Sequence, residues 1–340
     1  MTDGPSTPEV SVVLPTHNRH ALLTQTLRSV IWQVGVDLEI IVVDDGSTDG
    51  TSEVARSIDD DRIRVVSNRV PLGVSGARNR GIASARGEWV AFLDDDDLWA
   101  PDKLSSQLQA ARSTGRSWAY TGSVNITIDG RIVGGAPPHP PEIVAPALPS
   151  VNLIPGGCSG VLMRKDAVQS RDVFDGTYFH FADWDLWIRL SHDGMPAWVP
   201  RPLVGYRIHA GNASHDTDGM VAELDMIQDR YGGQVDRLRF YRHVARVSRR
   251  AGRRRQALKY YFRAAALRDP SYLRRTFLPD VREVLDELLQ EFGRRSCRSV
   301  PSLKPRHAED QFRDWREQAR PWIERLLGMS APDEPPSRLG

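Results

Sequence analysis

Short apolar runs alternate with amphipathic stretches over the first 215 residues. Four runs have the length and composition of buried strands; they occupy residues 10–15, 39–43, 62–67 and 89–93. Between them, apolar residues recur at helical spacing, as at Leu23, Leu27 and Val30. This β-α-β-α-β-α-β order predicts an α/β fold, with a mostly parallel sheet covered by helices on both faces.

Strand patterns stop near residue 221, and the rest of the chain is predicted to be helical. Helical spacing covers five segments, which are 223–231, 236–251, 254–268, 278–292 and 308–327. We therefore expect a catalytic domain over residues 1–220 and a helical domain over 221–330, which could contact an acceptor, a partner or a membrane surface. A Pro- and Ser-rich tail, 331–340, is expected to fray.

Two of the predicted strands end in adjacent acidic residues, at Asp44-Asp45 and at Asp94–Asp97. Parallel strands place their carboxyl ends at one edge of a sheet, where ligands of such folds collect, so we expect these carboxylates to converge. One interpretation is a divalent cation that holds a diphosphate, because Mg²⁺ binds protein through one or two carboxylates while phosphates supply the rest. The alternative is a solvated acidic turn before the next helix. Asp97 would support the site or cap that helix.

Three further side chains are candidates for chemistry, each with a structural alternative. Arg78 could bind anionic oxygens of a ligand, or it could pair with surface carboxylates. Asp183 lies in the first turn of a predicted aromatic-rich helix, where it could act as a general base or only as an N-cap. His209 could bind a metal or a phosphate, or be structural. Cys158 is expected to be a packing residue.

Composition limits the classes of binding partner and the cellular compartment that we expect. The net charge of +1 gives no general argument for a nucleic-acid partner, and two cysteines make neither a disulfide framework nor a Cys-based zinc site. The N-terminal residues lack an apolar signal region, and no apolar run reaches the ~20 residues of a spanning helix. A cytoplasmic protein is expected, soluble or attached to the cytoplasmic face of a membrane.

Two segments suggest contacts beyond the donor site. The proline-rich segment 134–155 is expected to be an irregular loop that forms a lid or contacts an acceptor. The arginines of residues 249–255 could meet anionic lipid or another polyanion, or form a solvated face.

Five segments carry a family resemblance when they are taken together and in order. They are residues 12–19 (VVLPTHNR), 41–49 (IVVDDGSTD), 76–81 (GARNRG), 87–97 (GEWVAFLDDDD) and 182–189 (ADWDLWIR). The chain resembles family 2 glycosyltransferases, which have the Rossmann-like GT-A fold, over residues 9 to 215. The resemblance implies a nucleotide-diphosphate-sugar donor, a divalent cation (Mn²⁺ or Mg²⁺), inversion at the anomeric carbon and a glycan, lipid-linked or small-molecule acceptor.

The resemblance also assigns roles to individual residues. It implies that Asp183 is the general base and that Asp96 and His209 bind the metal. Donor binding would fall to Pro15, Thr16, Asn18, Asp45, Arg78, Asp94 and Asp95. Thr16 and Asp45 would contact the nucleotide base, and Asp94 the ribose. One departure is Ala182, where the family usually has glutamate, so a contact to the acceptor or to a neighbouring helix could be missing.

Two other functions compete with glycosyl transfer. A nucleotidyltransferase would also need a nucleotide, a metal and an α/β sheet, but we would expect a glycine-rich phosphate loop after the first strand, and residues 15–19 contain no glycine. A non-catalytic nucleotide-sugar-binding protein would not need Asp183 beside intact donor motifs.

Overall fold

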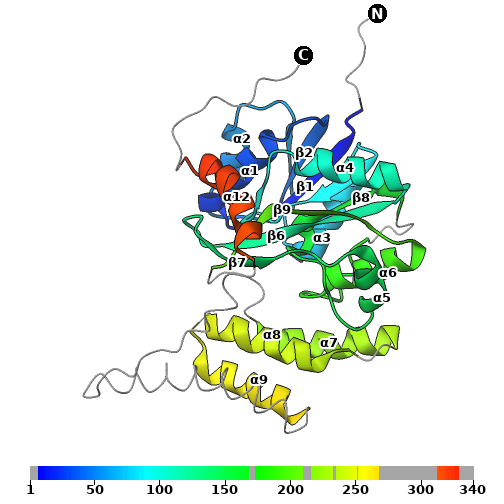
Figure 1. Cartoon of the computed structure of the whole chain (residues 1–340). Helices are drawn as coiled ribbons and strands as arrows, with labels where there is room; N and C mark the ends of the chain where they lie inside the picture. The colour runs from blue at the N-terminus through cyan, green and yellow to red at the C-terminus, as the bar shows by residue number, and fades with distance from the viewer. Residues whose placement is uncertain are drawn as a thin grey trace, which may run out of the picture. The chain divides into compact units, whose positions relative to one another are not determined.

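The computed structural model describes residues 7–167, 173–209, 216–232, 235–250, 252–267 and 312–328. The chain divides into two compact units (Figure 1). The first unit is made of residues 1–148, 152–208 and 310–340, and the second of residues 149–151 and 209–309.

The first unit is built on a single sheet in the order β3-β2-β1-β4-β8-β6-β9-β5. Its first four strands are parallel, as the sequence predicts, and β1 lies between β2 and β4. These strands are β1 (Val10–Thr16), β2 (Leu38–Asp44), β3 (Ile63–Ser67) and β4 (Trp89–Phe92). β1, β2 and β4 are buried along their whole length, because helices cover both faces of a parallel sheet.

The other half of the sheet is mixed, which corrects the expectation of a mostly parallel sheet. β8 is antiparallel to β4 and to β6, whereas β6 and β9 are parallel. The strands of this half are β5 (Leu98–Trp99), β6 (Trp118–Ile126), β7 (Ile132–Ala136), β8 (Val161–Arg164) and β9 (Ala197–Arg207). We did not predict β9, because Pro200 and Pro202 lie within it and prolines cannot donate to a strand ladder.

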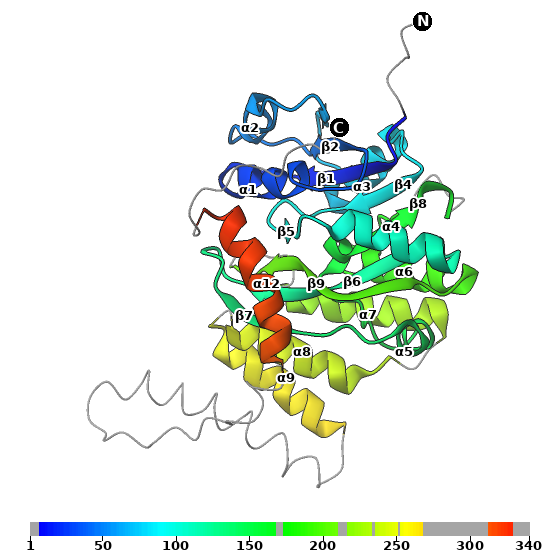
Figure 2. The same cartoon turned by 45° about the horizontal axis from the view of Figure 1, so that its top comes forward.

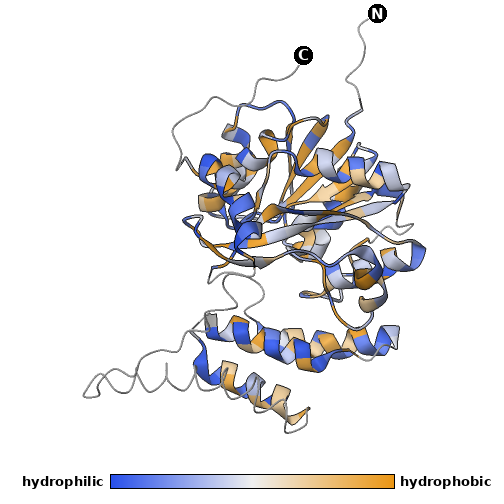
Figure 3. Cartoon of the chain, viewed as in Figure 1, coloured by the Kyte–Doolittle hydropathy of each residue, from blue (hydrophilic) through white to orange (hydrophobic). Residues whose placement is uncertain are grey.

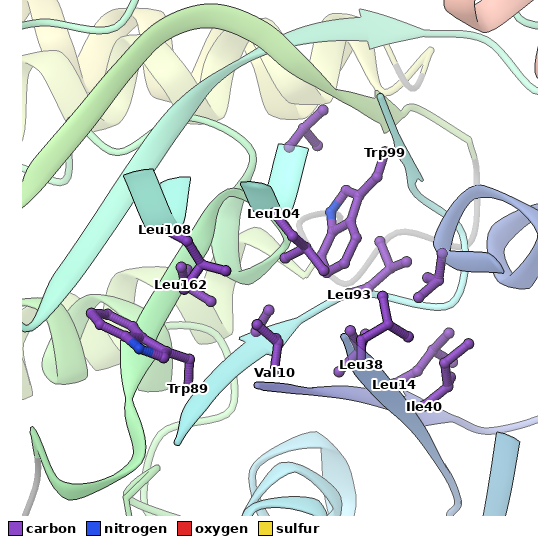
Figure 4. Packing of buried hydrophobic residues seen from close by; sticks show 14 of the residues in the cluster. Val10, Leu14, Leu38, Ile40, Trp89, Leu93, Trp99, Leu104, Leu108 and Leu162 are labelled. Atoms are coloured by element: carbon purple, nitrogen blue, oxygen red, sulfur yellow. The ribbon is translucent and has the colours of Figure 1, made fainter. Parts of the chain in front are cut away.

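Alternate residues of each strand face opposite layers of helices. Val12, Ile40 and Leu93 face α1 (His20–Ile31), α2 (Thr51–Ser57) and α4 (Lys103–Thr114) in one apolar core. Figure 4 shows Trp99 and Leu104 packed side by side there. The opposite face carries α3 (Gly73–Ser84) and α6 (Ala182–Asp193). A Cβ at Gly81 of α3 would stand 2.3 Å from Val13, so only glycine allows this close approach.

Two segments differ from the sequence-based expectation. The segment 134–155, expected to be an irregular loop, contains the end of β7 and the helix α5 (Pro141–Ala147). A proline at the first helical position is pre-organised for a helix start, which explains α5. The helix α12 (Arg313–Leu326), which we assigned to the helical domain, belongs to the first unit. Its Trp315, Ala319 and Ile323 pack on β6 residues in an apolar cluster, and Figure 2 shows α12 beside β7 and β9.

The second unit consists of helices within its described part. They are α7 (Thr217–Tyr231), α8 (Arg237–Arg250) and α9 (Arg254–Ala266), and α8 and α9 form a packed hairpin. The predicted helix 278–292 and the tail 331–340 lie outside the described residues. Of the helices the structure describes, none combines the length and the apolar character that crossing a membrane requires.

Candidate active site

The four aspartates at 94–97 form the connection from β4 to β5. β5 starts after five intervening residues, yet it pairs with β9, beyond β8 and β6 in the sheet order. The connection must therefore cross the edge of the sheet at the carboxyl ends of the parallel strands. Asp97 N donates to Asp94 O at 3.1 Å and so folds these residues into a turn.

The first two aspartates of the turn contact basic residues from two different elements. Asp94 Oδ1 accepts a hydrogen bond of 2.5 Å from Arg78 Nη2, and Arg78 is a buried residue of α3. Asp95 Oδ1 lies 3.6 Å from Arg19 Nε, in the loop after β1. Burial and the neighbouring charge of Asp96 raise the pKa of Asp95 to about 7, although Arg19 opposes this rise. The raised pKa of Asp95 therefore reflects the concentration of negative charge in this turn.

Asp97 is fully buried and is held by two segments that lie far along the chain. Its Oδ1 accepts from the backbone N of Arg207 at 2.9 Å, and its Oδ2 accepts from the Ser159 hydroxyl at 2.6 Å. Ser159 Oγ also accepts from Asp94 N at 3.1 Å, and Arg207 Nη1 donates to Asp96 O at 3.0 Å. Asp97 therefore supports the turn, and its neighbours fix the backbone from two sides.

Asp45 lies directly after β2, beside the end of β1. Its backbone N donates to Thr16 O at 2.8 Å. Its Oδ1 accepts from Asn68 Nδ2 and from Leu72 N, both at 2.8 Å. Within the described part of the chain no hydrogen bond reaches Asp45 Oδ2. A carboxylate can accept about four hydrogen bonds, so Asp45 keeps acceptor capacity for a ligand.

Asp183 lies in the first turn of α6, as the sequence predicts. Its Oδ1 accepts from Trp184 N at 2.7 Å. Burial raises the pKa of Asp183 to about 6, while the guanidinium of Arg78 opposes the rise and the charge of Asp94 adds to it. Arg78 is thus an electrostatic neighbour of both Asp183 and Asp94. A carboxylate whose pKa lies near 6 can accept a proton near neutral pH.

Two contacts position the start of α6 over α3. The side-chain amide of Asn79 donates to Phe174 O and accepts from Phe174 N, both at 2.8 Å. Ser75 Oγ donates to Tyr178 O at 3.3 Å. Both contacts tie the segment that precedes α6 to the helix that carries Arg78. These contacts therefore help to hold the start of α6 near Arg78.

The glycine-rich segment 156–160 approaches Asp183 from the other side. Gly157 has a positive φ of 53°, and a Cβ at this position would stand 3.6 Å from Asp183 Oδ2. Cys158 is buried, and burial raises the pKa of its thiol. Cys158 is therefore a neutral packing residue, as expected, and not an activated nucleophile.

Comparisons with known proteins identify the family of this chain. The family model described as "Glycosyl transferase family 2" matches residues 11–169. The UDP-Glc:alpha-D-GlcNAc-diphosphoundecaprenol beta-1,3-glucosyltransferase WfaP of Escherichia coli is 30% identical over 207 residues, which are 60% of this chain and 79% of WfaP. The chain belongs to glycosyl transferase family 2. The amylovoran biosynthesis glycosyltransferase AmsB of Erwinia amylovora is 34% identical, over 58% of this chain and 69% of AmsB.

Solved structures of S. aureus TarS share the fold of this family 2 chain. The structure of S. aureus TarS 1-349 in complex with UDP superposes with a TM-score of 0.54 at 16% identity, over 86% of this chain and 94% of that one. This likeness agrees with the predicted GT-A fold, and membership of family 2 makes the chain a glycosyltransferase. Family membership gives no support to either alternative, a nucleotidyltransferase or a non-catalytic binding protein.

The structure places the remaining predicted donor residues in supporting positions. Pro15 is buried in β1 opposite Val43 of β2. Asn18 has a positive φ of 54°, and its Oδ1 accepts from Thr48 N at 2.8 Å. This contact joins the loop after β1 to the loop after β2. Roles of Pro15 and Asn18 in donor binding remain predictions.

The acidic turn offers oxygen ligands for the expected cation, but the described residues do not form a complete metal site. Within the described ranges, no group of three or more His, Cys, Asp or Glu side chains is arranged to hold a metal ion. The oxygen-rich acidic turn nevertheless fits Mg²⁺ or Mn²⁺, which bind through one or two carboxylates when a diphosphate completes the coordination. A cation would also offset the charge that raises the pKa of Asp95. His209 belongs to the second unit, and its role as a ligand remains a prediction.

Sequence reasoning missed three residues of the site. They are Ser159, Tyr206 and Arg207. Burial and the charges of Asp97 and Asp96 raise the pKa of Tyr206, so its ring lies near the acidic turn. No local pattern marks these residues. The one available signal was Asp97, since a buried fourth aspartate requires hydrogen-bond donors from elsewhere in the chain.

Proposed function

We propose that this glycosyltransferase moves a sugar from a nucleotide-diphosphate-sugar to a hydroxyl group of a lipid-linked acceptor, with inversion at the anomeric carbon. The observation that carries the proposal is Asp183, a carboxylate with a pKa raised to about 6 that shares Arg78 as a neighbour with Asp94. The arrangement supports a base beside a donor-binding turn. WfaP is a glucosyltransferase named for UDP-glucose and a diphosphoundecaprenol acceptor, and the TarS structure contains UDP. Both favour a uridine nucleotide, and WfaP favours a lipid-linked acceptor.

The donor would lie along the carboxyl edge of β1, β2 and β4. Asp45 Oδ2 is suited to accept from an N–H of the nucleotide base, because Asn68 and Leu72 already hold Oδ1. Asp94, fixed by Arg78, is suited to the ribose. When bound, a divalent cation at Asp96 would neutralise the negative charge that develops on the leaving diphosphate.

The acceptor would approach from the side of α6. Asp183 would take the proton of the attacking hydroxyl as the new glycosidic bond forms and the bond to the diphosphate breaks. A single displacement of this kind inverts the anomeric carbon. The helix α5 is a candidate wall for the acceptor, because Trp184 Nε1 of α6 donates to Leu148 O, next to α5, at 2.7 Å.

A membrane setting follows from this choice of acceptor. An undecaprenyl chain remains in the bilayer, so its diphosphate head is reached only at the membrane surface. We propose that the protein acts there, on the cytoplasmic face.

The first test is the substitution Asp183→Asn, which keeps shape and removes the base. With UDP-glucose, Mn²⁺ and a synthetic N-acetylglucosamine-diphosphate-lipid, we expect transfer to fall about 10³-fold, the scale of a general base, while UDP binding measured by calorimetry stays within about twofold of wild type. The control is Asp193→Asn, an exposed carboxylate of the same helix, which should leave transfer unchanged. Full turnover by Asp183→Asn would refute the assignment. An anomeric proton coupling that reports retention would refute the single displacement.

A further inference from the structure

Positive charge is concentrated on the hairpin formed by α8 and α9. Residues 237–267 contain eleven arginines and lysines and no aspartate or glutamate, although the whole chain has a net charge of only +1. Such a block of one sign is unusual for a folded helix pair, where opposite charges at neighbouring positions normally stabilise the helices. Figure 3 shows the hydrophilic colour over much of α8 and at the beginning of α9.

The acidic helix of the same unit cannot neutralise this charge. α7 contains four carboxylates. Asp225 pairs with Arg237 at 2.6 Å, and Asp218 pairs with Lys259 at 3.1 Å. Asp218 also accepts from the hydroxyl of Tyr260 at 2.7 Å. The positive charge of the hairpin therefore exceeds what α7 offers.

The basic side chains are arranged on exposed stripes of both helices. Arg239, His243 and Arg246 of α8 are exposed at helical spacing, whereas Val244 and Ala245 are buried in the core of the hairpin. On α9, Arg255, Lys259 and Phe262 share one exposed face, since residues three and four apart lie on the same side of a helix. The stripes are surface features because the buried residues already form the core.

The exposed face of α9 combines cations with apolar side chains. Phe262 is 57% exposed and Leu267 is 48% exposed, and Arg263 lies between them in sequence. A helix with basic residues and exposed aromatic or leucine side chains on its outer face is typical of binding at a lipid–water interface, where the apolar groups enter the acyl boundary and the cations meet anionic headgroups.

We propose that the α8–α9 hairpin docks the protein on an anionic phospholipid surface. The inference rests on the proposed function in one respect, since a lipid-linked acceptor requires the enzyme to work at a membrane. Charge complementarity favours anionic lipid as the partner of this surface, because anionic leaflets attract clusters of arginine and lysine within about a Debye length. Docking would hold the enzyme where its acceptor is concentrated.

The test is vesicle co-sedimentation of the full chain, without donor or acceptor. Vesicles contain 30% phosphatidylglycerol in phosphatidylcholine or phosphatidylcholine alone, in 0.1 M or 0.5 M NaCl. We expect binding only to the anionic vesicles and a strong decrease at 0.5 M NaCl. Replacement of Arg253, Arg255 and Arg263 by glutamate should lower the partition coefficient by about 10²-fold or more, at about fivefold for each lost cation.

Control variants distinguish an effect of charge on this surface from an effect of net charge and from misfolding. Replacement of the exposed Arg28, Arg80 and Arg116 of the first unit by glutamate makes the same change in net charge and should leave partition within about threefold of wild type. Phe262→Ser should weaken the binding that remains at 0.5 M NaCl. UDP binding by each variant reports an intact first unit.

Three outcomes would overturn the proposal. They are equal loss of binding in the two triple variants, equal binding to neutral and anionic vesicles, and retention on a DNA fragment without any partition into vesicles. The result is also independent of turnover: vesicle binding without transfer would contradict the proposed reaction only, and transfer without vesicle binding would contradict the docking surface only.

Discussion

Buried and half-buried carboxylates lie at both edges of the parallel strands, and their surroundings differ. Glu39, at the amino edge, accepts from Ser11 Oγ and Arg86 N at 2.7 Å and from Arg64 Nη2 at 3.1 Å. Burial alone would raise the pKa of Glu39, but these donors outweigh it and lower the pKa. At the carboxyl edge, burial raises the pKa of Asp95 and of Asp183 above the usual range.

The difference distinguishes a structural carboxylate from a functional one. The chain itself supplies donors and cations to Glu39, so that the folded state is complete without a ligand. Around Asp95 and Asp183 the chain supplies fewer, and the remaining negative charge is costly until a cation, a hydroxyl proton or a ligand N–H arrives. Binding sites are therefore expected where burial is not fully compensated.

The largest expected contrast is in activity. Asp96→Asn should lower kcat/KM by about 10³-fold, because a metal contact to a leaving diphosphate contributes several kcal/mol. Its melting temperature should stay equal to that of wild type or rise, since one of four adjacent like charges is removed. Isothermal titration with UDP in the presence and absence of Mn²⁺ measures the binding part. Chelation with EDTA should lower UDP binding of the wild type to the level of the variant.

Glu39→Gln is the matched change at the amino edge. UDP binding and kcat should be close to wild type, which separates it from Asp96→Asn. UDP and Mn²⁺ should raise the melting temperature of Glu39→Gln more than that of Asp96→Asn, which gives the same distinction without a measurement of turnover. If both variants lost activity equally, the contrast between the two edges would be wrong.

The second contrast is in stability. Glu39→Gln should lower the free energy of unfolding by about 2 kcal/mol, because charge-assisted hydrogen bonds from two arginines are weakened, and the partial exposure of Arg64 and Arg86 limits the loss. Urea unfolding at pH 7 measures the effect, and Glu88→Gln, an exposed carboxylate nearby in sequence, is the control.

The pH dependence of this stability difference has a definite direction. Since the pKa of Glu39 is lowered in the folded state, its contribution is present above the unfolded pKa and disappears as the pH falls through the folded pKa. The unfolding curves of wild type and Glu39→Gln should therefore converge in acid. A difference that persisted unchanged at pH 3 would contradict the proposed role of the Glu39 charge.

The sequence predicts those parts of this arrangement that depend on local pattern. Apolar runs that end in Asp45 and in Asp94 identify parallel strands. The direction of these strands alone determines at which edge of the sheet their acidic residues converge. The sequence does not predict the contacts of Asp97, because its partners Ser159 and Arg207 lie 62 and 110 residues away. Nor does it predict the position of α12, since a glycine at 122 is needed to admit Trp315: a Cβ there would stand 2.3 Å from the indole. Such fits depend on tertiary packing and leave no periodic signal.

The smallest contrast concerns the dependence of a single pKa on a single neighbour. With saturating UDP-glucose and Mn²⁺, kcat should fall about tenfold for each pH unit below 6 and level off above it, because Asp183 acts in its deprotonated form and burial raises its pKa to about 6. Arg78 opposes that rise.

Arg78→Met should therefore move the inflection of the kcat profile to higher pH by about one unit, whereas Arg78→Lys, which keeps the charge, should leave it near 6. The inflection is the informative quantity, since loss of an Arg78 contact to the donor would lower the plateau without moving it. An inflection that stayed at the same pH in Arg78→Met would mean that burial alone sets the pKa of Asp183, and the electrostatic link between the base and the donor-binding turn would have to be abandoned.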